Sequence, residues 1–454
     1  MTAVDTPALD LAQLVADRSI DTMIAAFADP YGRLLGKRIP AGYFVEHVQQ
    51  GEVHACDYLL TADVELQPLP GFAFSSWEAG YGDMVLKPVL STLRLTPWFE
   101  KSALVLCDLQ RHDGKPIEES PRRILQRQIE RCCGYGLDPL MASELEFFAF
   151  KGTCLELQAT GFRPLVTTTP YIIDYDILGT SHDEGLLRDI RNLMPLARIE
   201  VEGSKGEWAC GQHEVNLAYC GALEMADRHV VFKQGVKQLA LKHGVAATFM
   251  AKVAREMAGS SCHIHTSLQG TDGRNAFWDD KTQKPSALFE HFLAGCMEHA
   301  RSLALCVAPL VNSYKRYQSA SFAPISVAWD VDNRTCGFRV VGHGRSLRIE
   351  NRMPGADVNP YLAFAATLAA GLDGVERKLP LPAPTRGNAY QTPGVPRLPT
   401  TLADAVQLFA GSEFAQKALG PVVASHYLRL AQLEQANYDS QVTDWEIKRY
   451  FERV

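Results

Sequence analysis

Glu144 and Glu146 lie in an apolar segment of the chain, SELEFFAF at residues 143–150. If this segment is a strand, its side chains alternate between two faces, and both carboxylates point to the same side. Two neighbouring buried like charges cost several kcal/mol unless something compensates them. Divalent cations are the simplest compensation, because hard cations prefer carboxylate oxygens. An edge strand with both acids in water is the alternative, and this segment alone does not decide between the two.

Further acids and histidines follow in similar surroundings. Glu202 and Glu207 bracket the segment GSKG, and Glu214 begins the strand-like sequence EVNL. Each of these glutamates alone would be interpreted as a solvated loop acid. A lone buried histidine is more often a core residue than a ligand. His263 and His265 are spaced to share one face of an apolar strand, which favours a site in which only one of them need be a ligand. Together with the first pair, these residues indicate a metal site rich in carboxylates.

Four arginines and one more glutamate follow in otherwise apolar sequence. They are Arg316, Arg334, Arg339 and Arg352, with Glu350 on the same expected strand face as the last. Each arginine alone would be interpreted as a solvated surface charge. Several together indicate an anion site, because guanidinium groups bind carboxylates and phosphates with two parallel hydrogen bonds. Carboxylates for metals beside guanidiniums for anions favour phosphoryl transfer.

Composition restricts the class of protein. The chain has 454 residues, 46% hydrophobic and 21% charged, which is typical of a soluble globular protein with two domains or one large one. A net charge of −7 indicates no nucleic acid and no anionic membrane as partner. We expect no signal peptide and no membrane-spanning segment, since apolar runs such as residues 362–372 are short. The 11 cysteines form no CxxC motif, which favours reduced thiols and a cytoplasmic location.

The pattern of elements predicts an α+β fold. Strands dominate residues 1–115, and strands and helices mix without regular alternation over residues 116–454, so we place a domain boundary between these ranges. No GxGxxG or GxxxxGK[ST] motif indicates a Rossmann site or a P-loop. Helices are expected at 8–19, 42–50, 121–134, 184–196, 227–243, 286–306, 360–371 and over much of 402–454. Strands are expected at 22–27 and around 36–38 as a hairpin, and at 83–86, 91–95, 103–108, 250–253, 263–268 and 348–352.

Several motifs, in a fixed order, resemble the glutamine synthetase family. They are SELEFF, VEGSKGEWACGQHE, GSSCHIHTSL, NSYKR, DNR, RIENR and NPYLAFAA. The resemblance extends over nearly the whole chain. It implies an N-terminal β-grasp domain and a catalytic domain with a curved antiparallel sheet. It also implies ring assemblies, commonly dodecamers, in which each active site lies between the N-terminal domain of one subunit and the catalytic domain of its neighbour.

The resemblance assigns roles to residues by their positions. One metal ion, Mg²⁺ or Mn²⁺, would be held by Glu146, Glu207 and Glu214. A second would be held by Glu144, His263 and Glu350. ATP would lie against Glu202, His265 and Ser267, and the catalytic residues Arg334 and Arg339 would contact its phosphates. Glutamate would be bound by Gly259, Arg316 and Arg352.

Three positions depart from the family pattern. Ala73 stands where ammonia-using members carry the aspartate of DGSS, and Phe322 stands where an acid normally precedes Ala-Pro. Ala258 replaces the asparagine that usually precedes the glutamate-binding glycine, so one glutamate contact is missing. We therefore expect Ala73 and Phe322 to line a pocket for an amine with an apolar body. The alternative is that a nearby acid, Glu78 or Asp83, takes over the lost role.

These departures suggest the glutamate–amine ligase branch of the family. The expected reaction joins the γ-carboxylate of glutamate to an alkyl- or arylamine through a γ-glutamyl phosphate, with ATP as cosubstrate, and gives a γ-glutamylamide, ADP and phosphate. A glutamine synthetase using ammonia and a glutamate–polyamine ligase are alternatives. A metabolite-sensing or structural ring without activity is the non-enzyme alternative.

Overall fold

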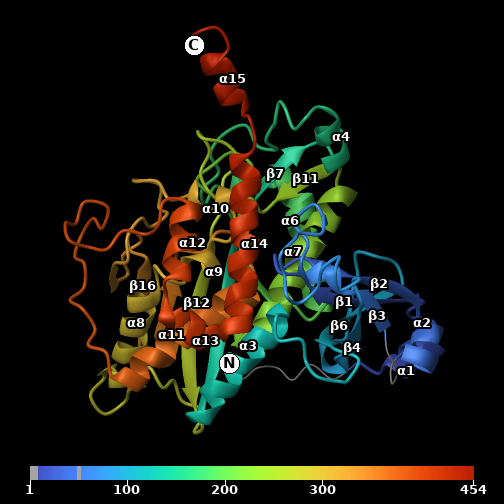
Figure 1. Ribbon diagram of the computed structural model, residues 1–454, viewed down its shortest axis with the longest axis horizontal. Coiled ribbons are helices and arrows are strands. Elements are labelled where there is room, and N and C mark those ends of the chain that lie inside the picture. Colours follow the sequence, from blue (N-terminus) through green and yellow to red (C-terminus); the bar gives the residue numbers. More distant parts are fainter. Residues whose placement is uncertain (1–8, 49–52) are drawn as a thin grey trace.

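The computed structural model describes residues 9–48 and 53–454, which form two β-sheets with helices around them (Figure 1). The smaller sheet has the order β2-β1-β6-β4-β3, with β5 paired to β6. β1 runs parallel to β6, and the other neighbours are antiparallel. Its strands are β1 (Thr22–Ala28), β2 (Leu34–Pro40), β3 (Val53–Cys56), β4 (Asp83–Pro88), β5 (Arg94–Leu95) and β6 (Ser102–Gln110).

The larger sheet has the order β15-β16-β17-β12-β7-β9-β8, with β10 and β11 also paired to β7. It is antiparallel except between β15 and β16. Its strands are β7 (Leu137–Lys151), β8 (Val201–Gly206), β9 (Gln212–Leu217), β10 (Cys220–Gly221), β11 (Val245–Thr248), β12 (Cys262–Gly270), β15 (Trp329–Val331), β16 (Phe338–Val341) and β17 (Arg348–Asn351). β13 (Trp278–Asp279) and β14 (Lys284–Pro285) form a separate hairpin.

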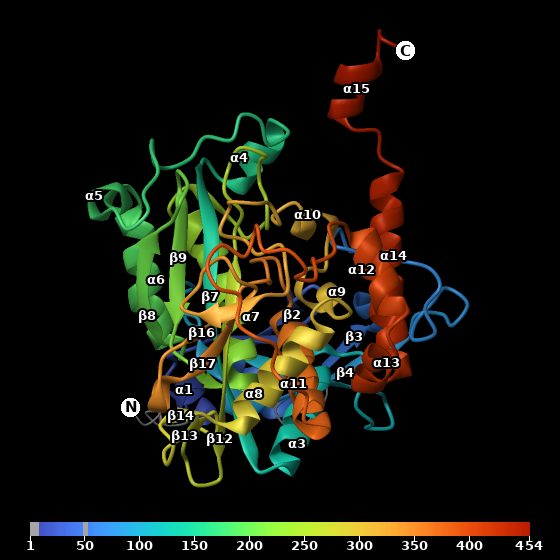
Figure 2. The same ribbon diagram turned by 90° about the vertical axis from the view of Figure 1, so that its left-hand side faces the viewer.

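Helices cover one face of the larger sheet. α3 and α7 pack against β7, and α11 contacts α3, α7 and α8 (Figure 2). The helices are α1 (Leu11–Ala16), α2 (Ala41–Tyr43), α3 (Pro121–Gly134), α4 (Cys154–Ala159), α5 (Ile177–Thr180), α6 (Glu184–Leu196), α7 (Ala222–Lys242), α8 (Ala287–His299), α9 (Ala304–Val307), α10 (Val311–Tyr314), α11 (Pro360–Arg377), α12 (Leu402–Ala410), α13 (Glu413–Leu419), α14 (Pro421–Asp439) and α15 (Asp444–Tyr450).

β7 is an interior strand of the larger sheet, and the burial of its side chains alternates. Met141, Leu145 and Phe147 belong to the main hydrophobic core. Glu144 and Glu146 lie between them in sequence, so they face the opposite side of the sheet. The edge-strand alternative for this segment is therefore wrong, because β7 has hydrogen-bonded neighbours on both sides.

The predicted α+β class is confirmed, and α6 and α3 have the bounds expected from the sequence. Four elements differ. The helix expected at 227–243 is α7, which begins five residues earlier, at Ala222. Residues 250–253 form no strand, because the side chain of Asn312 takes both backbone hydrogen bonds of Lys252. Residues 90–92 form a 3₁₀ turn rather than a strand, since the Thr92 hydroxyl donates to the Val89 carbonyl at 2.7 Å. The expected helix at 286–306 ends at His299, where the Ser302 hydroxyl competes for the His299 carbonyl.

Two smaller differences concern the N-terminal region. The helix expected at 8–19 is limited to α1, Leu11–Ala16. Residues 41–43 are α-helical and Phe44–Val48 is a π-helix. Residue 8 and residues 49–50 of the expected helices lie outside the described part of the chain.

Within the described part of the chain, no helix combines the length and apolarity that crossing a lipid bilayer requires. The 11 cysteines are free thiols.

Arg122 on α3 connects the smaller sheet to the helices. Its guanidinium donates two hydrogen bonds to the Asp227 carboxylate on α7, at 3.1 and 3.0 Å, and one to Asp108 on β6 at 2.6 Å. The Tyr361 hydroxyl on α11 donates to the same Asp227 carboxylate at 2.7 Å. Burial raises the pKa of Asp227, although Arg122 and Tyr361 stabilise its ionised form. The network therefore depends on every partner being present.

His426 on α14 holds the segment between β3 and β4. Its Nε2 donates to the carbonyl oxygen of Leu60 at 2.9 Å, and its ring packs against Phe72 with centroids 5.0 Å apart. Burial lowers the pKa of His426 to about 4. The neutral imidazole is therefore part of the folded structure.

Replacing Asp227 with alanine should destabilise the protein by about 3 to 5 kcal/mol, because it leaves the Arg122 guanidinium buried without its main partner. Thermal unfolding followed by calorimetry measures this. Asp444→Ala is the matched control, since the Asp444–Arg163 ion pair of 2.8 Å is exposed on both sides and should change the midpoint little. Equal midpoints for the two variants would contradict the structural role of Asp227.

The folded pKa of His426, about 4, lies below the ordinary value of 6.5. Its contribution to stability is thus fully present above pH 6.5 and is lost as the pH falls through about 4, which amounts to about 3 kcal/mol. His426→Gln keeps a side-chain N–H donor but cannot titrate, so its melting temperature should fall less steeply over this pH range. His343→Gln replaces an exposed histidine and serves as control. Parallel pH profiles for wild type and His426→Gln would refute the assignment.

Candidate active site

The register of the larger sheet lines up the residues expected to do chemistry. β12 places His263 opposite Glu144 on β7, and β9 places Glu214 opposite Glu146. Directly opposed residues of antiparallel strands share a face and lie in contact. The four side chains therefore gather on the face of the sheet away from α3 and α7.

The next strands extend this row. β17 places Glu350 opposite His265 on β12, and β16 places Arg339 opposite Glu350. Glu350 is 1% exposed, and its carboxylate accepts hydrogen bonds from Arg352 at 2.5 Å and Arg339 at 2.9 Å. Burial alone would raise the pKa of Glu350. The interactions with His263 and Arg352 outweigh burial and lower this pKa to about 2. This carboxylate is therefore ionised.

A cavity of about 440 Å³ opens on this face of the sheet. It brings together all six predicted metal ligands, both predicted phosphate-binding arginines, the three predicted glutamate-binding residues and one residue of the predicted amine pocket. These are Glu144, Glu146, Glu207, Glu214, His263, Glu350, Arg334, Arg339, Gly259, Arg316, Arg352 and Phe322.

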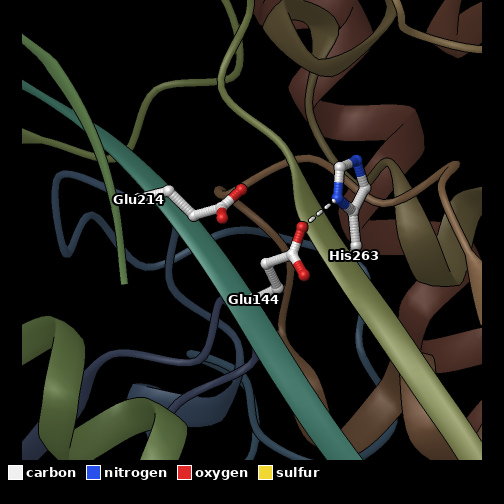
Figure 3. A group of neighbouring side chains, drawn as sticks. All are labelled: Glu144, Glu214 and His263. Atoms are coloured by element: carbon white, nitrogen blue, oxygen red, sulfur yellow. Dashed lines mark hydrogen bonds and ion pairs between the residues drawn. The ribbon is translucent and has the colours of Figure 1, made fainter. Parts of the chain in front are cut away.

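Three groups of side chains place their ligand atoms within 4.8 Å of one another. They are Glu146 with Glu207 and Glu214, Glu144 with Glu214 and His263, and Glu144 with His265 and Glu350. The first group coincides with one predicted ligand set. Figure 3 shows the second group, whose side chains converge between neighbouring strands. The second predicted set is divided between two groups, although the Nδ1 atom of His263 lies 2.7 Å from Glu144 and 3.5 Å from Glu350.

The carboxylates differ in charge state because their partners differ. Burial and the charge of Glu207 raise the pKa of Glu146 to about 8, and burial and the charge of Glu144 raise that of Glu214 to about 11. Burial would raise the pKa of Glu144 too, but hydrogen bonds from His263 at 2.7 Å and His265 at 3.3 Å hold it well below its usual range. The repulsion that remains is what a divalent cation would relieve, so the donor set fits such an ion.

Arg316 is a buried cation beside the carboxylates. It is 2% exposed, and it donates to Ser261 Oγ and to the carbonyl oxygen of Arg352, each at 3.2 Å. A Cβ on Gly259 would lie 2.3 Å from Arg316 Cγ, so glycine is required where this loop crosses the arginine. The Nε atoms of Arg316 and Arg352 are buried without a protein partner. An anionic ligand in the cavity would satisfy them.

Four predicted site residues do not line the cavity of this chain. Glu202 is exposed at a bulge in β8, and the Ser267 hydroxyl donates to Asn275 and Leu347. His265 Nε2 lies 3.3 Å from Glu144, and Arg348 donates to His265 Nδ1 at 3.2 Å. Ala73 lies exposed between β3 and β4. The sequence predicted that Ala73 and Phe322 line one amine pocket. In this chain Phe322 lines the cavity, whereas Ala73 does not.

Sequence reasoning gave no role to two residues that flank Glu207. The Lys205 ammonium pairs with Glu207 and lies 3.7 Å from Asp174 and 3.9 Å from Glu214. Although burial opposes it, the charges of Glu214 and Glu207 raise the pKa of Lys205. Trp208 lines the cavity beside them. Lys205 and Glu207 are two residues apart in a strand-like motif, so a shared face could have been inferred, whereas the ion pair with Glu214 required the hairpin register.

Comparisons with known proteins agree with this geometry. The family profile described as "Glutamine synthetase, catalytic domain" matches residues 118–450. Gamma-glutamylethanolamide synthetase GlnA4 of Streptomyces coelicolor is 47% identical over 445 residues, which cover 98% of this chain and 96% of that protein. Glutamate–isopropylamine ligase of a Pseudomonas species is 36% identical, with 98% of each chain covered.

Solved structures give the same result. A structure titled "Apo GmaS without ligand" superposes with a TM-score of 0.85 and 28% identity, covering 98% of this chain and 99% of that one. An ADP complex of GmaS gives a TM-score of 0.84. Because the family profile spans more than half of the sequence and the full-length relatives exceed 30% identity, this chain belongs to the glutamine synthetase family.

Proposed function

We propose that this protein is an ATP-dependent ligase that joins the γ-carboxylate of glutamate to a small organic amine and releases ADP and phosphate. One observation carries the proposal. The cavity contains the carboxylates, imidazole and buried arginines that acyl-phosphate chemistry needs, and Phe322 lines it. The family resemblance places an ammonium-binding acid at the position of Phe322. The names of two relatives, an ethanolamide synthetase and an isopropylamine ligase, support the same reaction.

The carboxylates of the cavity would hold the ions. Glu146, Glu207 and Glu214 form one ligand set, and Glu144 with His263 and Glu350 forms the second. Mg²⁺ or Mn²⁺, when bound there, would supply the positive charge that offsets the negative charge of the phosphates during phosphoryl transfer. The hydrogen bonds from Arg339 and Arg352 fix the Glu350 carboxylate before any ligand arrives, so this ligand is already oriented.

The arginines would bind and orient the anions. Arg316 and Arg352 hold the carboxylates of glutamate, with Gly259 in the adjoining loop, and direct its γ-carboxylate towards ATP. Arg334 and Arg339 stabilise negative charge on the transferred phosphoryl group. Glu202, His265 and Ser267 would lie on the nucleotide side. The amine attacks the resulting γ-glutamyl phosphate, and phosphate leaves as the amide bond forms.

Other features of the family remain proposals for this chain. They are a division into an N-terminal β-grasp domain of residues 1–115 and a catalytic domain of residues 116–454, assembly into a ring, and a cytoplasmic location. The ring would explain Ala73, because a neighbouring subunit could bring this residue to the cavity that its own chain does not reach. The free cysteines support a reducing compartment.

ADP release by the wild-type protein, measured with ATP, Mg²⁺, glutamate and a panel of amines, tests the reaction. We expect a higher kcat/KM with a monoamine such as isopropylamine or ethanolamine than with ammonia, because the site lacks the acids that hold ammonium. If ammonia is the best acceptor, the protein is a glutamine synthetase instead. A diamine as best acceptor would identify a polyamine ligase, and no ADP release with any amine would favour a sensor or structural role.

Glu350→Gln should lower ADP release with every amine at least about 100-fold, because it removes a charged metal ligand while keeping the side-chain size. Binding of Mn²⁺, followed by electron paramagnetic resonance, should weaken in parallel. Glu224→Gln is the matched control, because Glu224 is also paired with two arginines, Arg94 and Arg228, but lies outside the cavity lining. Undiminished Mn²⁺ binding in Glu350→Gln would show that the metal assignment is misplaced.

A further inference from the structure

Two aromatic side chains meet at the entrance of the cavity. The rings of Trp208 and Phe322 contact edge to face, with centroids 6.2 Å apart, and both residues line the cavity. Trp208 is 56% exposed and Phe322 is 52% exposed. Exposed aromatic rings gain nothing from the core of the protein, so their position at the cavity entrance suggests a role in binding.

Hydrogen bonds anchor the backbone that carries each of the two rings. Trp208 follows Glu207 in the five-residue loop between β8 and β9, and its backbone N–H donates to Glu207 Oε2 at 3.1 Å. Arg352 donates to the carbonyl oxygen of Phe322 at 3.4 Å, and the Tyr390 hydroxyl donates to that of Ala323 at 3.0 Å. The ring pair is thus connected on one side to a candidate metal ligand and on the other to a candidate glutamate-binding arginine.

The backbone at Phe322 is strained. Phe322 has a φ of +58° and Ala320 a φ of +59°, in the left-handed region of backbone conformation that residues other than glycine rarely adopt. Such strain is unfavourable and persists where surrounding contacts impose it, often at ligand-binding sites. A glycine would relieve the strain, so the ring at this position has a use that offsets its cost.

We propose that Trp208 is a specificity-determining residue, and that with Phe322 it forms an aromatic clamp for the apolar substituent of a small primary alkylamine. The proposal rests on the ligase function proposed above. The rings offer apolar surface and no carboxylate, so they stabilise an alkyl group and give ammonia nothing to bind. The cavity of about 440 Å³ must also admit glutamate and the phosphates, which restricts the substituent to a few carbons.

The charges around the clamp disfavour a polyamine. Apart from the six predicted metal ligands, Asp174 is the acid among the described residues that line the cavity. Lys205 lies 3.7 Å from Asp174, and its ammonium lies 4.6 Å from the centroid of the Tyr175 ring. A second ammonium group of a diamine would meet this cation, whereas an uncharged alkyl end would not.

The test compares kcat/KM for isopropylamine with kcat/KM for ammonia in wild type and variants. Trp208→Ala should lower this ratio about tenfold, since an apolar contact of one or a few carbons is worth that factor in discrimination. The loss should come from the KM for isopropylamine and not from the KM for glutamate. Trp208→Phe should recover part of the ratio, because a ring remains. Phe322→Gly should lower the ratio in the same direction without straining the loop.

Trp445→Ala is the matched control, since Trp445 on α15 is 59% exposed but does not line the cavity, and its ratio should equal that of wild type. An unchanged ratio in Trp208→Ala, with ADP binding intact by calorimetry, would overturn the clamp. Fully additive effects in the Trp208→Ala, Phe322→Gly double variant would also contradict it. If the two rings act together, removing either one already removes their shared contribution, so the second substitution adds less. Failure of wild type to release ADP with any amine would instead refute the ligase function.

Discussion

The structure depends on the burial of several carboxylates on one face of a β-sheet. Glu146, Glu214 and Glu350 are buried on strands of this sheet, and Glu144 beside them is half-buried. Such a gathering is unfavourable by itself, because burial and mutual repulsion both oppose ionisation. The hydrogen bonds from the imidazoles of β12 and the charges of Arg339 on β16 and Arg352 after β17 partly compensate for it.

The compensation differs from one carboxylate to the next. Glu350 and Glu144 have protein partners that lower their pKa, whereas the pKa of Glu146 and Glu214 is raised. The first two are ready as charged ligands. The charges of the other two are not fully compensated, because the nearby cation Lys205 pairs with Glu207. The protein alone thus leaves a deficit of positive charge where two metal ions would lie.

The part of the cavity around Trp208 and Phe322 is aromatic, whereas the part around the carboxylates is charged. Trp208 and Phe322 are exposed aromatic residues next to charged ones, and the loop that carries Phe322 adopts a strained backbone. The charged and the aromatic parts of the lining thus lie side by side in one cavity. In the proposed function, the loop after β8 and the segment around residue 322 would select the acceptor, while side chains on the sheet would hold the metal ions.

Local sequence determined the elements that carry the site. Alternation in SELEFF and in HIH places Glu144 with Glu146 and His263 with His265 on shared faces, because a strand repeats every two residues. The family motifs, not the spacing, indicated which distant acids belong together. Only the tertiary structure decided the strand register that opposes Glu146 and Glu214, the grouping of His265 with Glu350, and the contact between Trp208 and Phe322. These depend on hydrogen bonds and packing between segments far apart in the chain, and no local pattern encodes them. Asn312 shows the same at residue 252, where a distant side chain prevents the strand that local apolarity favoured.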